Sequence, residues 1–203
     1  MIVYIFRGEY RGKGEALLRR AIEMYCKEQD QSGCRDFRQG TVLDINLDCL
    51  PLKKPETGKP YLEGIPLHFS ISHTGKLWGC LISPRNAGLD IQEKRKVNFN
   101  KLAERFFLNE EIEFVREKGI DGFFDIWVRK EACVKYYGTG LRDIKSFCVV
   151  KDGKLTEKIN GKDSVCFVGA FEPDADVKCA YCCSMEGSDL WIRELNDSPS
   201  RRA

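Results

Sequence analysis

The hydrophobic and polar positions of the chain change period several times, and each period predicts an element. An apolar run at residues 1–7 predicts a first strand, and apolar residues at helical spacing over residues 14–26 predict a helix. Two runs at 67–73 and 77–83 flank a short turn at Thr74-Gly75 and predict a hairpin. A further strand over residues 41–47 is possible within a loop-rich segment.

A third run at residues 88–92 predicts a strand that completes a meander with the hairpin. Strand side chains alternate between the two faces of a sheet. Asp90 and Gln92 are therefore expected on one face, and Glu93 on the opposite face.

The middle of the chain has helical periodicity, with capping residues at the expected places. Asn98 or Asn100 can cap a helix over 101–107. Further helices are predicted over residues 110–118, capped by Asn109, and from Asp121 to Tyr137, where Gly138 ends the pattern. The remaining predicted strands cover residues 146–150, 164–171, 177–184 and 190–195. The chain thus mixes helices and strands in two halves of similar size.

Composition supports a soluble globular protein and excludes some partners. The chain has 203 residues, 42% of them hydrophobic, and 33 basic residues against 31 acidic ones. A net charge of +2 gives no bulk attraction to nucleic acid or to a membrane. No apolar stretch approaches the ~18–20 residues of a membrane span, and the first apolar run reads as a strand rather than a signal peptide. The sequence therefore predicts a cytoplasmic protein.

The ten cysteines are many for a chain of this length. Most of them lie inside apolar patterns, where a thiol acts as a small hydrophobic group. Cys179 and Cys182 have the spacing of a zinc knuckle, but no second pair completes four ligands. We interpret the cysteines as free thiols, buried or half-buried, in a reducing cytosol.

Trp127, Glu131 and Lys135 recur every four residues and share one helix face. In the simplest interpretation, Glu131 and Lys135 form an exposed ion pair worth ~0.3–0.5 kcal/mol. However, apolar residues surround most of this helix, and an inward-facing acid and lysine then need a ligand or a metal. Asp90, at a strand end, could complete an oxygen site for Mg²⁺, or it could simply accept backbone hydrogen bonds.

Other polar residues could hold phosphate groups. Ser72 and His73 lie at the hairpin tip, although a lone histidine is more often structural. Lys59 lies in a Gly-Lys-Pro turn, or it is a solvated loop lysine. Lys13 lies between two glycines at a helix start, which is a weak phosphate signal without the Walker spacing.

Taken in order, these motifs resemble one family. They are Gly58-Lys59-Pro60, Phe69-Ser-Ile-Ser72-His73, Gly88-Leu-Asp90-Ile-Gln92, Arg105-Phe-Phe107 and Trp127-x-x-Lys130-Glu131-Ala-x-x-Lys135. Their order and spacing are similar to those of 4′-phosphopantetheinyl transferases of the surfactin-synthetase-activating type. The resemblance covers roughly residues 10–150.

The resemblance implies an α+β fold of two similar halves, related by a pseudo-twofold, with the active site between them. Residues 1–85 would form the half that contacts the coenzyme A phosphates, and residues 86–195 the half with the metal and catalytic residues. Residues 196–203 would be a polar tail. It also implies an enzyme that moves the 4′-phosphopantetheine arm of coenzyme A to a serine of an apo acyl or peptidyl carrier protein. The other product is adenosine 3′,5′-bisphosphate, and a monomer would suffice.

The resemblance further implies roles for single residues. Asp90 and Glu131, with Gln92 as a third metal position, would hold Mg²⁺ with the diphosphate of coenzyme A. Glu131, directly or through a metal-bound water, would take the serine proton. Lys135 would neutralise charge on the diphosphate and the leaving group.

The nucleotide contacts follow in the same way. Lys59, Ser72 and His73 match positions that hold the phosphates of coenzyme A. Further basic contacts, near the N-terminus in longer relatives, can be matched only loosely to Arg11 or Lys13. The carrier would dock along residues 93–107, where a basic run could steer an acidic partner.

Gln92 departs from the family pattern, because many members carry glutamate there. An amide oxygen can bind a metal but brings no charge, so we expect weaker Mg²⁺ affinity with the chemistry intact. Two other functions stay open at this point. One is a Mg²⁺-dependent phosphodiesterase using Asp90, Glu131 and His73, and the other is a binding module for coenzyme A or a carrier that has lost activity.

Overall fold

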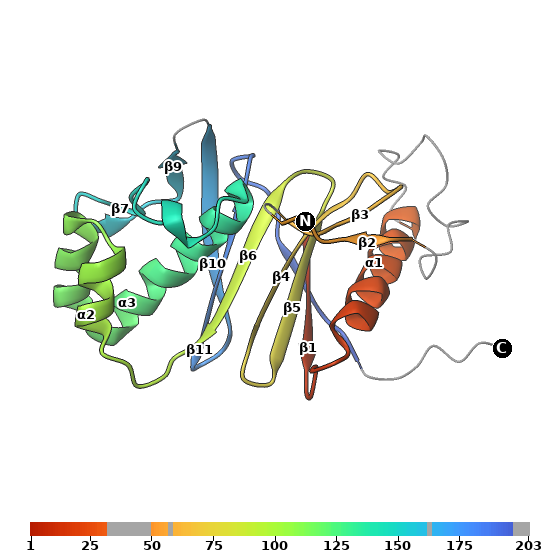
Figure 1. Cartoon of the computed structure of the whole chain (residues 1–203), viewed down its shortest axis with the longest axis horizontal. Coiled ribbons are helices and arrows are strands. Elements are labelled where there is room, and N and C mark those ends of the chain that lie inside the picture. Colours follow the sequence, from red (N-terminus) through yellow and green to blue (C-terminus); the bar gives the residue numbers. More distant parts are fainter. Residues whose placement is uncertain (32–49, 57–58, 162–163, 197–203) are drawn as a thin grey trace.

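A computed structural model describes residues 1–31, 50–56, 59–161 and 164–196 of the chain. Two four-stranded sheets lie side by side, each with a long helix packed on it (Figure 1). The elements are, in chain order, β1 (Ile2–Arg7), α1 (Gly14–Gln31), β2 (Leu52–Lys53), β3 (Tyr61–Leu62), β4 (His68–Thr74), β5 (Leu77–Ser83), β6 (Ala87–Glu93), α2 (Phe99–Phe106), α3 (Asn109–Tyr137), η4 (Leu141–Asp143), β7 (Val150–Lys151), β8 (Lys154–Leu155), β9 (Lys158–Asn160), β10 (Val165–Asp174), β11 (Val177–Cys183) and β12 (Trp191–Glu194). The strand considered over residues 41–47 lies outside the described residues.

The two sheets repeat one strand order. The first sheet runs β12-β1-β5-β4, and the second runs β6-β11-β10-β9. In the first sheet β1 pairs antiparallel with β5, and β5 pairs antiparallel with β4. In the second sheet β6 pairs antiparallel with β11, and β11 pairs antiparallel with β10. In each half a helix follows the first strand, α1 after β1 and α3 after β6. The predicted α+β fold of two similar halves is therefore confirmed.

The last strand of the chain returns to the first half. Strand β12, at residues 191–194, pairs in parallel with β1 and so belongs to the first sheet. Residues 191–194 fall within the range 86–195 expected for the second half, but their backbone pairing is with the first sheet. Nothing in its local pattern could identify the sheet to which it returns.

Strand β6 does not complete the predicted meander. It pairs through its backbone with β11 of the second sheet, and β4 pairs only with β5. Side-chain hydroxyls of β4 instead accept hydrogen bonds from the backbone of the neighbouring β6. These bonds run from Leu89 N to Ser70 Oγ (2.9 Å), from Ile91 N to Ser72 Oγ (3.1 Å) and from Glu93 N to Thr74 Oγ1 (3.1 Å). The row of hydroxyls thus joins the two edge strands without a shared backbone ladder.

Helix α3 is longer than predicted, because it joins the two helices expected over residues 110–118 and 121–137. The join is a kink at Gly119, whose φ of 66° and ψ of −146° are not helical. Leu108, not the predicted Asn109, is the N-cap, and its N–H donates to the side chain of Glu111 at 2.8 Å. Gly138 ends the helix in the left-handed region (φ 70°), as predicted.

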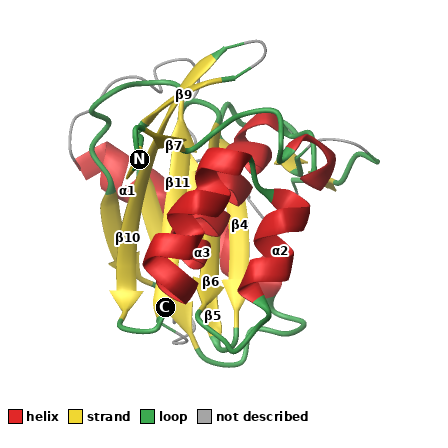
Figure 2. Cartoon of the chain, turned by 90° about the vertical axis from the view of Figure 1, so that its left-hand side faces the viewer, coloured by secondary structure: helices red, strands yellow, loops and turns green. Residues whose placement is uncertain are grey.

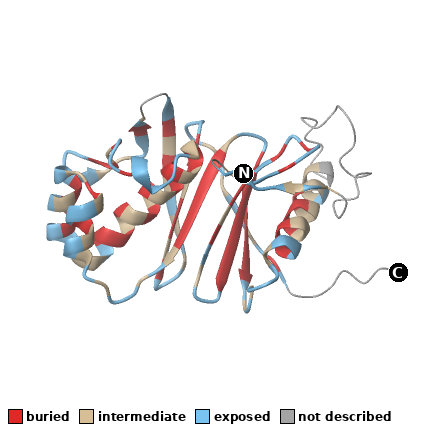
Figure 3. Ribbon diagram, in the orientation of Figure 1, coloured by how far each residue is buried: buried red, intermediate tan, exposed pale blue. Residues whose placement is uncertain are grey.

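Burial is greatest along the strands at the centre of the molecule (Figure 3). Every residue of β5 is buried, and so are the first five residues of β6. Helix α3 covers one face of the second sheet, with β4 beside it (Figure 2). In the described ranges, no helix has the length and apolar character needed to cross a bilayer.

The prediction of free, buried or half-buried cysteines holds for the part of the chain that the structure describes. Eight cysteines there are free, of which Cys26 and Cys148 are partly exposed and the others are buried. The remaining two, Cys34 and Cys49, lie outside the described residues.

Candidate active site

Asp90 is the most constrained acid of the predicted site. It lies in β6 with its side chain only 3% exposed, and its Oδ1 accepts hydrogen bonds from Lys135 Nζ and Ser72 Oγ, both at 2.8 Å. Its other oxygen, Oδ2, is buried and has no hydrogen-bond partner among the described residues. A buried carboxylate oxygen without a partner is costly, so this atom marks a place for a ligand.

Gly88 sets the distance between β6 and α3. A Cβ at this position would overlap the carbonyl oxygen of Ala132 and lie 2.6 Å from the backbone nitrogen of Tyr136. Only glycine allows the strand to pack directly on the helix backbone. This close packing brings Asp90 against the helix that carries Glu131 and Lys135.

The surroundings of Glu131 disfavour the ionised form of its carboxyl. Burial and, after it, the negative charge of Asp90 raise the pKa of its carboxyl to about 7, while Lys135 opposes the shift. Two neighbouring carboxylates and one unpartnered oxygen suit a small divalent cation, which binds oxygen ligands. On these observations the donor set fits Mg²⁺.

Glu131 and Lys135 line a cleft of about 710 Å³ together with Lys59. The Lys59 ammonium donates to Asn86 Oδ1 (2.9 Å) and to the carbonyl of Ala87. Burial lowers the pKa of Lys59 to about 8, and the charge of Lys135 adds to this effect. An anion in the cleft would raise this pKa again by stabilising the ammonium, so the cleft favours a phosphate-bearing ligand.

His73 and Arg11 line a smaller cleft of about 330 Å³. The hydroxyl of Tyr10 lies 3.2 Å from His73 Nδ1, in hydrogen-bond contact. Lys13 is not among the residues that line this cleft, and its Nζ lies 5.9 Å from the centre of the Phe6 ring. Both clefts are lined by Pro60, Phe69 and Ile71. The clefts are thus neighbours, with Arg11 better placed than Lys13 to reach a ligand in them.

Gln92 lies two residues after Asp90 and is partly exposed. Leu89 and Ile91 point to the opposite face, where they join a hydrophobic core with residues of β1 and β5. The Glu93 carboxylate lies against Gly75, in the β4–β5 turn. The alternation predicted for this strand therefore holds, and Glu93 does not replace Gln92 on the face of Asp90.

Lys130 and Glu111 form a second ion pair that sequence reasoning missed. Lys130 Nζ lies 2.8 Å from Glu111 Oε1, and both side chains are 0% exposed. Lys130 also donates to the Phe147 carbonyl at 2.6 Å, and Glu111 accepts from Val149 N at 2.9 Å. The pair ties the start of α3 to the segment that follows it.

Three further residues support the site, and two of them, Asn86 and Tyr10, had no sequence signal that could have identified them. Asn86 accepts from Lys59 and donates to the Tyr136 carbonyl at 2.6 Å, so it joins the cleft lysine to α3. Tyr10 contacts His73 from a segment 63 residues earlier. Gly88 had a signal, because it opens the Gly-Leu-Asp motif, but its packing role depends on a helix that comes much later in the chain.

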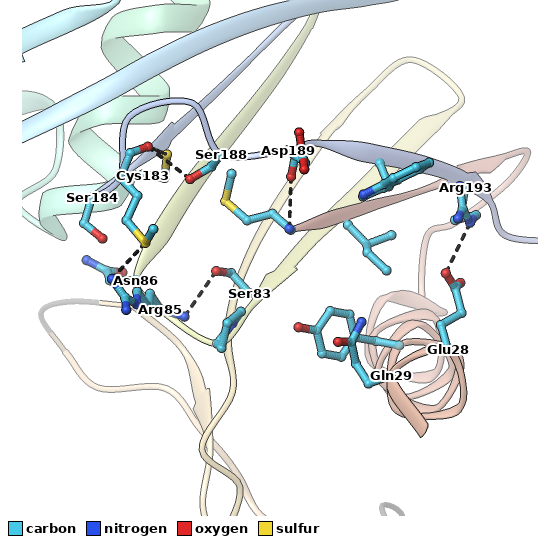
Figure 4. Close-up of a pocket in the computed structure, with 16 residues that line it drawn as sticks. Glu28, Gln29, Ser83, Arg85, Asn86, Cys183, Ser184, Ser188, Asp189 and Arg193 are labelled. Atoms are coloured by element: carbon cyan, nitrogen blue, oxygen red, sulfur yellow. Dashed lines mark hydrogen bonds and ion pairs between the residues drawn. The ribbon is translucent and has the colours of Figure 1, made fainter. Parts of the chain in front are cut away.

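A third cleft, of about 1000 Å³, lies where the chain enters β1 and leaves β5 and β11. Figure 4 shows Arg193 and Glu28 pointing toward one another across it, with 3.2 Å between Nε and Oε2. The N-terminal amine donates to the Asp189 carbonyl at 3.1 Å. None of the predicted catalytic residues lines this cleft, so its polar groups do not belong to the site of Asp90 and Glu131.

The structure is a two-half α+β protein, and the donor groups of its first cleft suit a phosphate-bearing ligand and a divalent cation. Residues 86–182 match the family described as the 4′-phosphopantetheinyl transferase superfamily. The matched segment contains Asp90, Glu131 and Lys135. These residues therefore lie within the segment that is similar to the 4′-phosphopantetheinyl transferase superfamily, and the resemblance found in the motifs is confirmed.

Curated relatives extend the likeness into the first half. A 4′-phosphopantetheinyl transferase of Bacillus subtilis is 33% identical over 135 residues, which are 63% of this chain and 60% of that protein. The 4′-phosphopantetheinyl transferase gsp of Aneurinibacillus migulanus is 33% identical over 156 residues, 72% of this chain and 63% of that protein. The chain thus spans somewhat under two thirds of the length of these relatives.

Proposed function

We propose that this protein is an enzyme that transfers the 4′-phosphopantetheine group of coenzyme A to a serine of an apo acyl or peptidyl carrier protein. The products are the holo-carrier and adenosine 3′,5′-bisphosphate. The observation that carries the proposal is the buried, unpartnered Oδ2 of Asp90, beside a second carboxylate of raised pKa and two cleft lysines. This arrangement suits a diphosphate and a divalent cation, and the named relatives are such transferases.

Asp90 and Glu131 would hold Mg²⁺, with Gln92 or a water in the third position. The bound ion neutralises charge on the diphosphate, which phosphoryl transfer requires. Lys135 is already fixed against Asp90 at 2.8 Å, so it is positioned to stabilise the same oxygens.

The chemical step joins the serine oxygen of the carrier to the phosphorus of the pantetheine arm. The bond from that phosphorus to the bridging oxygen breaks, and adenosine 3′,5′-bisphosphate leaves with its electron pair. Glu131 takes the serine proton, a role suited to a carboxyl whose pKa is about 7. Lys59, Ser72 and His73 hold the nucleotide phosphates, with Arg11 or Lys13 as a further basic contact.

The carrier is expected to dock along residues 93–107. Within that segment Lys94 is held by Asp121 at 3.0 Å, whereas Arg95 and Lys96 are exposed. Exposed cations of this kind steer an acidic partner to the site. We further propose that the protein acts in the cytoplasm as a monomer, with residues 1–85 contacting the coenzyme A phosphates.

The test is incubation with coenzyme A, Mg²⁺ and an apo carrier, followed by measurement of the intact mass of the carrier. We expect a gain of one phosphopantetheine arm that depends on Mg²⁺ and is absent when the carrier serine is replaced by alanine. Asp90→Asn should abolish the gain, because it removes charge from the proposed cation site. Hydrolysis of coenzyme A without any gain by several carriers would favour a phosphodiesterase instead. Binding of coenzyme A with neither reaction would indicate a binding module.

A further inference from the structure

Three cysteines from three different elements meet in the core of the second half. Cys133 lies on α3, Cys166 on β10 and Cys182 on β11, and their sulfur atoms all lie within 4.8 Å of one another. Each of the three residues is 0% exposed, and none forms a disulfide. Helix α3 packs on this side of the sheet, so the thiols lie where helix and strands face each other (Figure 2).

The group is not the one that sequence spacing suggested. Cys179 and Cys182 have zinc-knuckle spacing, but positions three apart in a strand point to opposite faces. Cys182 belongs to the core between α3 and the second sheet, whereas Cys179 belongs to the core between the two sheets. The thiols that meet Cys182 come from elements far away in sequence.

The separation of the three sulfur atoms is close to the one they would have as ligands of a single ion. A metal–sulfur bond of ~2.3 Å places the sulfurs of a planar three-coordinate site about 4 Å apart. Thiolate ligands select soft cations, chiefly Cu(I) and Zn(II). A structural Zn(II) site takes four ligands, and the group in the described residues offers three, so three-coordinate Cu(I) is favoured.

We propose that Cys133, Cys166 and Cys182 form a closed binding site for a single soft cation, Cu(I) in the first place. Tyr137 provides the surrounding contact that such a site needs. Its hydroxyl donates to the carbonyl of Ser164 at 3.1 Å and lies 3.3 Å from the sulfur of Cys166, so a thiolate there would compete for the same hydrogen. The side chain of Tyr137 is partly exposed, so it links the buried thiols to the surface.

Occupation of the site would fasten α3 to two strands of the second sheet. Cys133 lies two residues after Glu131 and two before Lys135, on the other side of the helix. An ion at the three thiols would therefore stiffen the helix segment that carries the proposed catalytic residues. The site itself is independent of the proposed function, because it shares no ligand with the cleft.

The experiment is an anaerobic titration of the reduced full-length protein with Cu(I) in the presence of bicinchoninate. We expect one equivalent of Cu(I) to be taken from the chelator, with three sulfur neighbours seen by X-ray absorption. The midpoint of thermal unfolding should rise by about 5 °C or more, as for a ligand well above its dissociation constant. Cys133→Ala and Cys182→Ala should each weaken binding at least 100-fold.

Cys179→Ala is the matched control, because it removes a buried thiol from the same strand but from the other core. It should leave both the stoichiometry and the affinity unchanged. If a Cys→Ala variant loses its native circular dichroism, Cys166→Ser tests the same sulfur group with a near-isosteric side chain. The proposal fails if Cu(I) binding survives these substitutions or if it does not raise the unfolding midpoint. Zn(II) held as tightly as Cu(I) in a parallel chelator competition would overturn the three-coordinate assignment.

Discussion

Two lysines of helix α3 each form an ion pair with a carboxylate at the same distance, but the two pairs differ in burial and in what they leave open to a ligand. Lys130–Glu111 and Lys135–Asp90 both measure 2.8 Å. In the first pair both side chains are fully buried, and the acid also accepts two backbone N–H groups. In the second pair the lysine is 29% exposed, and one buried oxygen of Asp90 has no partner within the part of the chain that the structure describes.

This difference distinguishes an ion pair that stabilises the fold from one that can take part in binding a ligand. A buried pair whose hydrogen bonds are all satisfied has nothing left to offer a ligand, and it holds elements in place. A pair with an unpartnered buried oxygen beside a cleft is incomplete until something binds. We therefore expect Lys130 to act in positioning and Asp90, Glu131 and Lys135 in the proposed chemistry, and each role can be tested separately.

The largest expected effect is on the rate of transfer by Glu131→Gln. The amide cannot take a proton, so the rate should fall by about 100- to 10,000-fold at pH 7.5. The measurement is the initial rate of holo-carrier formation at saturating coenzyme A. Glu117→Gln, an exposed position on the same helix and outside the proposed docking segment, is the control and should keep the full rate. A Glu131→Gln enzyme within threefold of the original would remove this residue from the proposed mechanism.

The next effect concerns stability and compares the two lysines directly. Lys130→Met leaves Glu111 buried without its cation, and breaking such a pair costs about 3–5 kcal/mol of unfolding free energy. Lys135→Met should cost much less, because this lysine is partly exposed and Asp90 keeps the hydroxyl of Ser72. Urea unfolding at pH 7 measures both variants.

A double variant sharpens this comparison. Lys130→Met combined with Glu111→Gln removes both charges and should recover part of the lost stability. Equal destabilisation by Lys130→Met and Lys135→Met would contradict the division of the two pairs into a structural pair and an open one.

A third effect depends on pH through Glu131. Because its pKa in the folded protein is raised from 4.5 to about 7, the folded state binds this proton more tightly than the unfolded state. The stability that the group contributes is therefore complete below pH ~4.5 and is lost as the pH rises through about 7. Glu131→Gln should accordingly gain stability relative to the original protein between pH 5 and pH 8, by up to about 3 kcal/mol.

Chemical unfolding at several pH values, without divalent cations, checks this expectation. Adding Mg²⁺ should reduce the gain, since the ion favours the ionised carboxyl. A gain that is the same at pH 5 and pH 8 would show that the carboxyl of Glu131 titrates normally.

Local patterns predicted most elements, and their failures have physical reasons. Alternation located β4, β5 and β6 within one residue, but it could not show that β6 leaves the meander. Hydroxyl side chains at Ser70, Ser72 and Thr74 substitute for a backbone ladder there, and a hydrophobic pattern does not distinguish the two. Asp121 gave an ordinary signal for the start of a new helix, and the kink at Gly119, whose φ and ψ are not helical, lies close to that predicted boundary.

The candidate site was predictable as a set of residues but not as a geometry. The spacing within α3 placed Glu131 and Lys135 on one face, whereas their nearness to Asp90 depends on contact between β6 and α3 at Gly88. Lys130 was overlooked because a lysine among charged neighbours looks exposed in sequence. Its partner Glu111 lies five turns earlier on the same kinked helix, and only the fold shows that both side chains are buried.

The smallest effect is expected at Gln92, which shares a strand face with Asp90 but is partly exposed. Gln92→Glu would add a negative charge near the proposed cation site. Because residue 92 is partly exposed, water would weaken the attraction between this charge and the cation. An increase in apparent Mg²⁺ affinity of roughly tenfold is expected, about 1.4 kcal/mol. The rate at saturating Mg²⁺ should change little, because Glu131 and Lys135 are untouched. Glu93→Gln, on the opposite face, should leave the Mg²⁺ dependence as it is. If Gln92→Glu also left that dependence unchanged, residue 92 would not be the third metal position. Asp90 and Glu131 would then be the two protein ligands of the proposed cation.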